Sequence, residues 1–130
     1  MAECEVLTLC SGVVGDLSKP SLAEVLSVLE PPSLPADANV VMFARVRFDV
    51  GDEGRRTLDW VVSDPDGQET KFFVDDSDWK VVGDHAFAFK LFFQSRMIPL
   101  SSYGDYKLSL LLDGMSFTDI MLRVRRPAVA

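Results

Sequence analysis

Apolar and polar residues alternate with a period of two along most of the chain, which is the pattern of β-strands that bury one face. The longest such stretch is Asn39–Val50, where every second residue is apolar and the residues between them include Arg45, Arg47 and Asp49. The same alternation recurs later in the chain, at residues 58–62, 87–93 and 106–112, and residues 71–74 and 117–124 are expected to pair back as hairpin strands. Glu5–Ser11 is instead almost continuously apolar, as in a strand that is covered on both faces or lies deep in a sandwich.

Turn-forming residues separate these segments. Asp64-Pro65-Asp66-Gly67 and Asp113-Gly114 predict two tight hairpins, because proline presets φ and glycine adopts positive φ freely. Gly51–Gly54 predicts a further turn, Asp75–Gly83 an acidic loop, and Ser95–Tyr103 a connection. The pattern gives seven or eight antiparallel strands, with no internal repeat and no domain boundary. We therefore predict that residues 1–130 form one all-β domain, a sandwich or a barrel.

The stretch Lys19–Glu30 fits two interpretations. Ser21 and Glu24 have the spacing of a helix capping box. Apolar residues then repeat at helical spacing, at Leu22, Val25, Leu26 and Leu29. Much of the same stretch also fits an alternating strand. The pattern alone favours a short helix near residues 21–30 and leaves the strand open, and the prolines that follow end either element.

Composition and charge narrow the range of partners. The formal net charge is -7, and the pI is about 4.6. Proteins that bind nucleic acid or anionic membranes need a basic surface, and the basic cluster here is confined to Arg123, Arg125 and Arg126. We therefore expect neither partner. With 130 residues, 48% of them hydrophobic, the chain is long enough to bury a core without a disulfide or a metal.

The cysteines and the N-terminus predict a compartment. Cys4 and Cys10 are six positions apart in one predicted strand, which separates them by about 20 Å, beyond disulfide reach. Two unpaired cysteines suit a reducing compartment. The N-terminus lacks the basic and apolar regions of a signal peptide, and no segment is long enough to span a membrane. We expect a cytoplasmic protein.

Residues that could perform catalysis are sparse. A hydrolase that used the single histidine, His85, as a base would need a nucleophile and an orienting group beside it, and the sequence indicates neither. Cys4 and Cys10 lie in an apolar strand near acidic residues, which raises the pKa of a thiol. The sequence contains no phosphate-binding glycine loop and no cysteine pairs at zinc spacing. We predict no enzyme and no cofactor.

Acidic residues are concentrated between residues 64 and 84. Carboxylates at alternate loop positions hold calcium through their oxygen atoms, and the candidate ligands are Asp64, Asp66, Asp75, Asp76 and Asp78. The Asp64–Gly67 segment is too short for an EF-hand loop, and no bidentate glutamate follows at the required position. A small-ligand or metal-binding domain that uses these acidic loops is the alternative hypothesis, and solvated turns explain the same residues.

Two features favour contacts with protein. Arg45 and Arg47 project from one strand face, where they can bind a carboxylate or phosphate or pair across strands. The apolar run of Met97, Ile98, Pro99 and Leu100 marks an interface if it is exposed, and closes one end of the sandwich if it is buried. We predict a non-catalytic binding or assembly module that acts through sheet-edge or sheet-face contacts with a protein partner or with itself. The interface candidates are Arg45, Arg47, Met97, Ile98 and Leu100.

Four segments together carry a family pattern: Leu7-Thr8-Leu9-Cys10, Lys19–Ala36 with its final Leu34-Pro35-Ala36, Phe43–Phe48, and Tyr103–Leu108 with Asp113-Gly114. Through them the chain resembles, over most of its length, a family of small bacterial proteins of unknown function. The resemblance implies an immunoglobulin-like β-sandwich, with a strand at residues 21–30. Family members typically have a glycine where this chain has Glu24. The resemblance implies no catalytic or binding residue.

Overall fold

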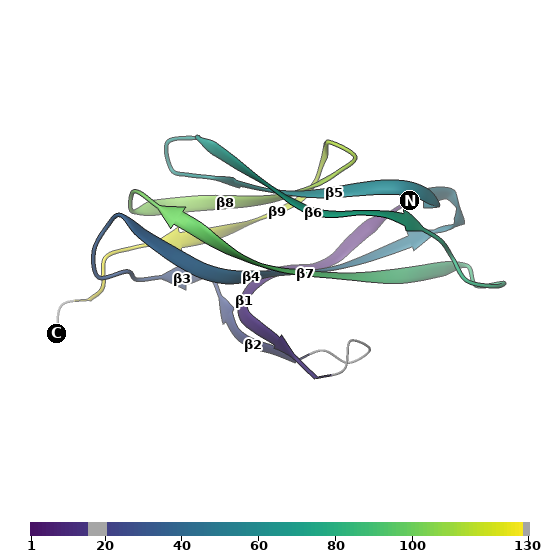
Figure 1. Ribbon diagram of the computed structural model, residues 1–130, viewed down its shortest axis with the longest axis horizontal. Helices are drawn as coiled ribbons and strands as arrows, with labels where there is room; N and C mark the ends of the chain where they lie inside the picture. Colours follow the sequence, from purple (N-terminus) through teal and green to yellow (C-terminus); the bar gives the residue numbers. More distant parts are fainter. Residues whose placement is uncertain (16–20, 129–130) are drawn as a thin grey trace.

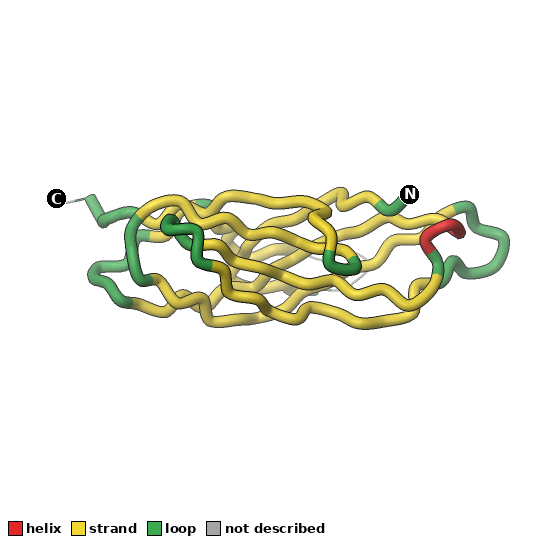
Figure 2. The backbone as a smooth tube through the Cα atoms, turned by 90° about the horizontal axis from the view of Figure 1, so that it is seen from above, coloured by secondary structure: helices red, strands yellow, loops and turns green. Residues whose placement is uncertain are grey.

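The computed structural model describes residues 1–15 and 21–128, and these form nine strands in two facing layers (Figures 1 and 2). The strands are β1 (Glu3–Val14), β2 (Ser21–Leu26), β3 (Val28–Leu29), β4 (Ala36–Asp49), β5 (Gly54–Ser63), β6 (Glu69–Trp79), β7 (Phe87–Leu100), β8 (Gly104–Leu112) and β9 (Met115–Val124). A short 3-10 turn at Val50–Asp52 joins β4 to β5. The all-β architecture predicted from the alternation is confirmed.

The two layers are separate sheets. The first sheet has the strand order β2-β1-β4-β7, and the second sheet has the order β3-β9-β8-β5-β6. All neighbouring strands run antiparallel except β3, which lies parallel to β9. The pairing of β4 with β7 is continuous over 14 residues, from Ala36 opposite Leu100 to Asp49 opposite Phe87. This uninterrupted register determines which side chains of β7 point into the core and which point outward.

The core lies between the sheets and is built from alternate residues of each strand. The even-numbered residues of β4 are at most 3% exposed from Val40 to Phe48. Opposite them, the second sheet contributes Leu58, Trp60, Leu108, Leu110 and Leu122, all at most 1% exposed. Burial of each such side chain contributes roughly 1.5–3 kcal/mol before chain entropy is subtracted. The inward face predicted for residues 39–50 is therefore confirmed.

Three features identify the sandwich as immunoglobulin-like. Strands β4 and β7 lie in one sheet and β5, β8 and β9 in the other, as strands B and E and strands C, F and G do in that fold. Trp60 is buried on β5, at the place of the buried tryptophan of strand C. The hydroxyl of Tyr106, early in β8, donates a hydrogen bond to the backbone oxygen of Ser102 at 2.9 Å, which is the tyrosine corner of these sandwiches.

Residues 21–30 are strands β2 and β3, so the strand interpretation is confirmed and the helix is not formed. The first two residues of the Lys19–Glu30 stretch lie outside the described residues. Strand β2 pairs with β1, and Leu26 lies opposite Leu9. This pairing provides hydrogen-bond partners for backbone N–H and C=O groups that a helix would have paired within itself. Glu24 has a φ of 48°, in the left-handed region that favours glycine. That conformation accounts for the glycine that the family resemblance associates with this position.

Two predicted connections are wrong because the strands continue through them. The predicted acidic loop begins at Asp75, but β6 continues to Trp79, paired with the start of β5. The predicted connection begins at Ser95, but β7 continues to Leu100, paired with the start of β4. Polar residues at positions 75–78 and 94–96 suggested loops. They are tolerated in strands here because β6 and β7 are the edges of their sheets.

Candidate functional site

The outer faces of the two sheets differ in chemistry. By register, the outward residues of the second sheet are mainly charged or polar, among them Lys71, Asp105, Lys107, Asp119 and Arg123. The outward residues of β7 in the first sheet are mainly aromatic or apolar, and they pair with the outward residues of β4. Soluble proteins rarely expose such a contiguous apolar surface unless it has a partner.

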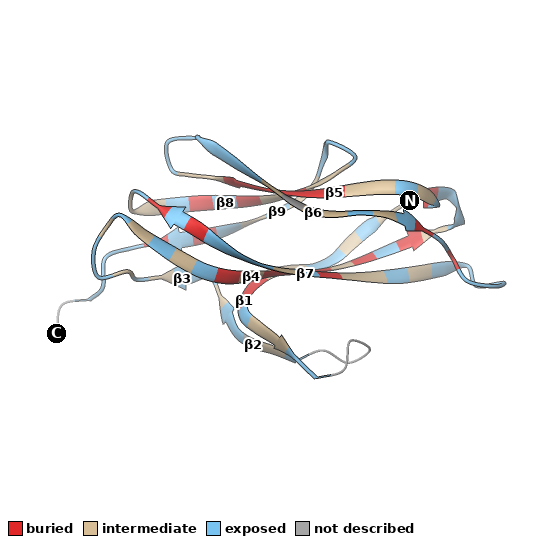
Figure 3. Cartoon of the chain, viewed as in Figure 1, coloured by how far each residue is buried: buried red, intermediate tan, exposed pale blue. Residues whose placement is uncertain are grey.

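We call this surface the aromatic face, and it consists of Phe87, Phe89, Leu91, Phe93 and Met97 of β7, Arg45 and Arg47 of β4, and Val6 of β1. Three of its phenylalanines are 40–48% exposed, and Met97 is 57% exposed. Figure 3 shows that exposed and half-buried segments alternate along β7. The exposed parts of these side chains amount to roughly 400 Å², taking about 200 Å² for a large side chain that is fully exposed. The largest patch of an ordinary monomer has this size and is often functional.

Two arginines lie flat on this surface. The guanidinium carbon of Arg45 is 4.0 Å from the ring centre of Phe89, and that of Arg47 is 4.2 Å from the ring centre of Phe87. The rings of Phe87 and Phe89 meet edge to face, with their centres 5.4 Å apart. A guanidinium stacked on a ring keeps its N–H groups at the rim, where they can bind a carboxylate.

The charges around the two arginines are unequal. Arg45 has an ion pair with Glu5, at 3.5 Å between Nε and Oε1. Among the described residues, Arg47 forms no ion pair, although the chain has 20 acidic and 13 basic residues. The guanidinium of Arg47 is therefore held in place by its stacking on Phe87 and is open to a partner.

The free edges of the sheets are less suited to contact than the aromatic face. On β7 the inward positions include Lys90, Gln94 and Arg96, and charges that point inward from an edge strand oppose the addition of another strand. Lys90 Nζ donates to Ser77 Oγ of β6 at 2.9 Å, which links the two edges across the open side of the sandwich. On β6, charged residues stand at many positions.

The structure places three of the five interface candidates on the aromatic face: Arg45, Arg47 and Met97. It places Ile98 and Leu100 in the core, 1% and 2% exposed, so these two are corrected to packing residues. The alternation of β7 causes the difference, because neighbouring residues of a strand point to opposite faces. The alternation predicted Phe87, Phe89, Leu91 and Phe93 as one unbroken apolar face, but the structure turns this face outward and places Phe92 in the core instead.

The acidic candidates do not form a metal site. The Asp64 carboxylate accepts backbone N–H groups of Asp66 and Gln68, both at 2.9 Å, which stabilises the turn. Asp76 is paired with Arg55 at 3.0 Å, and Asp75 accepts a hydrogen bond from Ser77. Asp78 lies opposite Arg55 in the register of β5 and β6. Within residues 1–15 and 21–128, no three acidic, histidine or cysteine residues are grouped closely enough to hold a metal ion.

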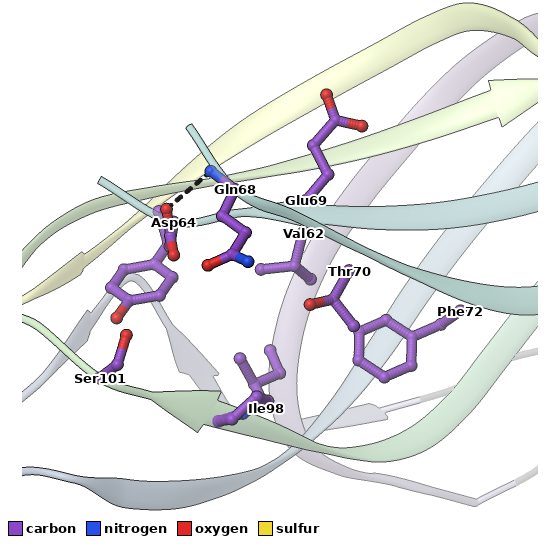
Figure 4. Close-up of a pocket in the computed structure, with 10 residues that line it drawn as sticks. Val62, Asp64, Gln68, Glu69, Thr70, Phe72, Ile98 and Ser101 are labelled. Carbon is purple, nitrogen blue, oxygen red and sulfur yellow. Dashed lines mark hydrogen bonds between the residues drawn. The ribbon is translucent and has the colours of Figure 1, made fainter. Parts of the chain in front are cut away.

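A small pocket opens between the end of β7 and the edge strand β6 (Figure 4). Its volume is about 250 Å³, and its lining includes Val62, Thr70, Phe72, Ile98 and Ser101. Figure 4 shows the Glu69 carboxylate directed away from Ile98 and Ser101, while the hydrogen bond from Gln68 holds Asp64. The pocket therefore presents no convergent set of free polar groups.

The remaining candidate residues have ordinary surroundings. His85 is exposed in the turn before β7, at the rim of a shallow depression formed with Phe87 and Phe89. Burial raises the pKa of the Cys4 thiol to about 11, and burial also raises the pKa of the Cys10 thiol, which makes both poor nucleophiles.

In the described part of the chain, no helix has the length and apolar character needed to cross a membrane.

The profile of a family described as a family of unknown function, DUF6941, matches residues 5–125. No curated protein matches the chain. Among solved structures, the Pseudomonas fluorescens alkylpurine DNA glycosylase AlkC bound to abasic-site DNA is similar, with a TM-score of 0.65 and 9% identity over 95% of this chain. The chain spans only 30% of that glycosylase, so the likeness concerns the fold alone. An immunoglobulin-like protein from Pseudomonas aeruginosa has a TM-score of 0.37 and 16% identity, over 96% of this chain and 97% of that one.

Proposed function

The chain belongs to the DUF6941 family of unknown function, and on that premise we propose that it is a non-catalytic binding or assembly module whose contact surface is the aromatic face. The observation that carries the proposal is the row of half-exposed phenylalanines on β7 with two arginines stacked on it. Aromatic residues and arginine are the residue types that contribute most energy at protein interfaces.

The unequal chemistry of the two sheets supports this choice of surface. Solubility alone would favour charged residues on both outer faces, and the second sheet has them. The aromatic face instead exposes apolar area, which contributes roughly 25 cal/mol for each Å² that a partner removes from water. About 400 Å² of such area supplies roughly 10 kcal/mol before the entropy of association is subtracted. That gain is enough for a specific, reversible complex.

The charged edge strands support contact through the sheet face over contact through a sheet edge. We propose further that the protein works in a cytoplasmic, reducing compartment, because Cys4 and Cys10 are both free thiols. Its partners are proteins, since phosphate-binding surfaces need more basic residues than the aromatic face offers.

Site-specific photocrosslinking in cells tests the proposal. A photoreactive phenylalanine at position 89 lies on the aromatic face, and the same residue at position 121 is a matched control, because Met121 is 54% exposed on the outer face of the second sheet. We expect a discrete protein adduct at position 89 and none at position 121. Equal adducts at both positions, or none at position 89, would refute the aromatic face as the contact surface.

A further inference from the structure

Met97 is the most exposed apolar side chain of the aromatic face. It is 57% exposed, whereas the three phenylalanines of this face are 40–48% exposed. By register Met97 lies opposite Asn39 of β4, and its neighbours on the same face of β7 are Ser95 and Pro99. All three of these residues are themselves exposed. The thioether side chain of Met97 is therefore open to small molecules in the solvent.

We propose, on the basis of the proposed function, that oxidation of Met97 to methionine sulfoxide by hydrogen peroxide releases the partner from the aromatic face. In this reaction the sulfur attacks one oxygen of the peroxide and forms an S–O bond. The O–O bond breaks, and the second oxygen leaves as water with both protons. The sulfur loses two electrons and the peroxide gains them. Methionine sulfoxide reductases reverse the oxidation, so Met97 acts as a reversible switch.

Oxidation changes the chemistry that Met97 offers to a partner. The thioether is an apolar group that packs well against apolar and aromatic side chains. The sulfoxide is polar, and its oxygen loses its hydrogen bonds with water when an apolar partner covers it. Because Met97 exposes a larger fraction of its side chain than any phenylalanine of the face, its burial is a large part of the contact. We expect the oxidised protein to bind its partner roughly tenfold more weakly.

Oxidation by peroxide leaves the fold intact. Met42, on β4, lies in the core and is 0% exposed, so the folded protein protects it. Met97 points away from the core, and the pairing of β7 with β4 uses backbone groups that oxidation does not alter. Met115 and Met121 are 75% and 54% exposed, and both belong to β9 of the second sheet. The oxidation that affects the aromatic face is therefore the oxidation of Met97.

The two thiols compete poorly for the peroxide. The thiolate is the reactive form of cysteine. Burial raises the pKa of the Cys4 thiol to about 11 and also raises the pKa of the Cys10 thiol, so both are largely protonated at neutral pH. The side chain of Cys10 is in addition 0% exposed. Oxidation therefore occurs first at the exposed methionines.

Peptide mass spectrometry of the peroxide-treated protein tests the chemistry. We expect one added oxygen on each of Met97, Met115 and Met121, none on Met42, and an unchanged Tm. A Met97 that stays reduced while Met121 is oxidised overturns the proposal. A large fall in Tm after treatment also overturns it, because the loss of contact then follows from unfolding.

Photocrosslinking tests the effect on the contact. Purified protein with the photoreactive phenylalanine at position 89 is treated with hydrogen peroxide, freed of peroxide and added to untreated cell lysate, so that this chain alone is oxidised. At limiting protein concentration we expect the yield of the discrete adduct to fall about tenfold, and a methionine sulfoxide reductase to restore it. In Met97→Leu, peroxide should leave the adduct yield of the variant unchanged. The matched control Met121→Leu, on the second sheet, should lose the adduct as the parent does.

The outcomes separate this inference from the proposed function. An adduct at position 89 that peroxide leaves unchanged overturns the switch and keeps the contact surface. A loss that persists in Met97→Leu, which retains the exposed Met1, Met115 and Met121, overturns the role of Met97. The absence of an adduct with untreated protein overturns both the switch and the contact surface.

Discussion

The tyrosine corner allows a sharp prediction about the immunoglobulin-like fold. Tyr106 is 1% exposed, and its hydroxyl serves both backbone groups of Ser102: it donates to the oxygen at 2.9 Å and accepts from the nitrogen at 3.3 Å. The substitution Tyr106→Phe keeps the ring and removes only this oxygen. Any loss of stability therefore reports on the two hydrogen bonds and not on packing.

The magnitude follows from the cost of leaving buried polar groups without partners, about 1–3 kcal/mol for each. Ser102 is half-buried, so water compensates in part, and we expect Tyr106→Phe to lower the free energy of unfolding by about 2 kcal/mol. For a chain of this length that corresponds to a fall in Tm of about 7 °C.

Urea denaturation followed by tryptophan fluorescence measures this loss, because Trp60 and Trp79 are both buried. Tyr103→Phe is the matched control: the Tyr103 hydroxyl has no hydrogen bond within the described residues, and we expect a loss below about 0.5 kcal/mol. A Tyr106→Phe variant as stable as the parent, or an equal loss in Tyr103→Phe, would refute the role given to the corner.

Two further predictions concern positions with positive φ. Glu24→Gly relieves the left-handed backbone at φ 48° and should raise the free energy of unfolding by about 0.5 kcal/mol in urea denaturation, whereas Glu24→Ala, which keeps the strain, should not. Asp113→Asn tests a charge: the backbone N–H of Thr57 and then the Arg56 guanidinium hold the pKa of the Asp113 carboxyl below its ordinary value. Because the folded pKa is depressed, the carboxylate stabilises the fold above the unfolded pKa of about 3.9, and this contribution is lost as the pH falls through the folded pKa. Asp113→Asn should therefore be less stable than the parent at pH 7, with the difference vanishing at lower pH, and a difference that persists there would contradict the assignment.

The sequence predicts the layers of this fold better than it predicts the surface. In β4 apolar residues alternate with polar ones such as Arg45, Arg47 and Asp49, and this alternation predicts which face is buried. The structure confirms that the apolar face lies in the core. In β7 the odd-numbered residues from Phe87 to Phe93 are all apolar and predict a buried face, but the even-numbered residues, among them Phe92, point into the core. The side that faces solvent is decided by long-range pairing with β4, since a shift of one residue would exchange the two faces.

The same reason limits what the sequence says about the candidate site. The sequence predicts that Arg45 and Arg47 project from one strand face. Their stacking on Phe89 and Phe87 could not be predicted, because it depends on the register of two strands about 40 residues apart in the chain. The acidic residues looked like one cluster because they are close in sequence. The structure distributes them between a turn and the paired strand β6, where backbone N–H groups, Ser77 and Arg55 engage several of them.

The central claim is that the aromatic face is covered in the cell, and thiol accessibility measures this directly. Variants Phe89→Cys and Met121→Cys are labelled with a maleimide in intact cells and as dilute purified protein, where Cys4, with its raised pKa of about 11, reacts slowly. We predict that position 89 is protected in cells and accessible in dilute solution, while position 121 is accessible in both. Equal labelling of the two positions in cells would contradict the account.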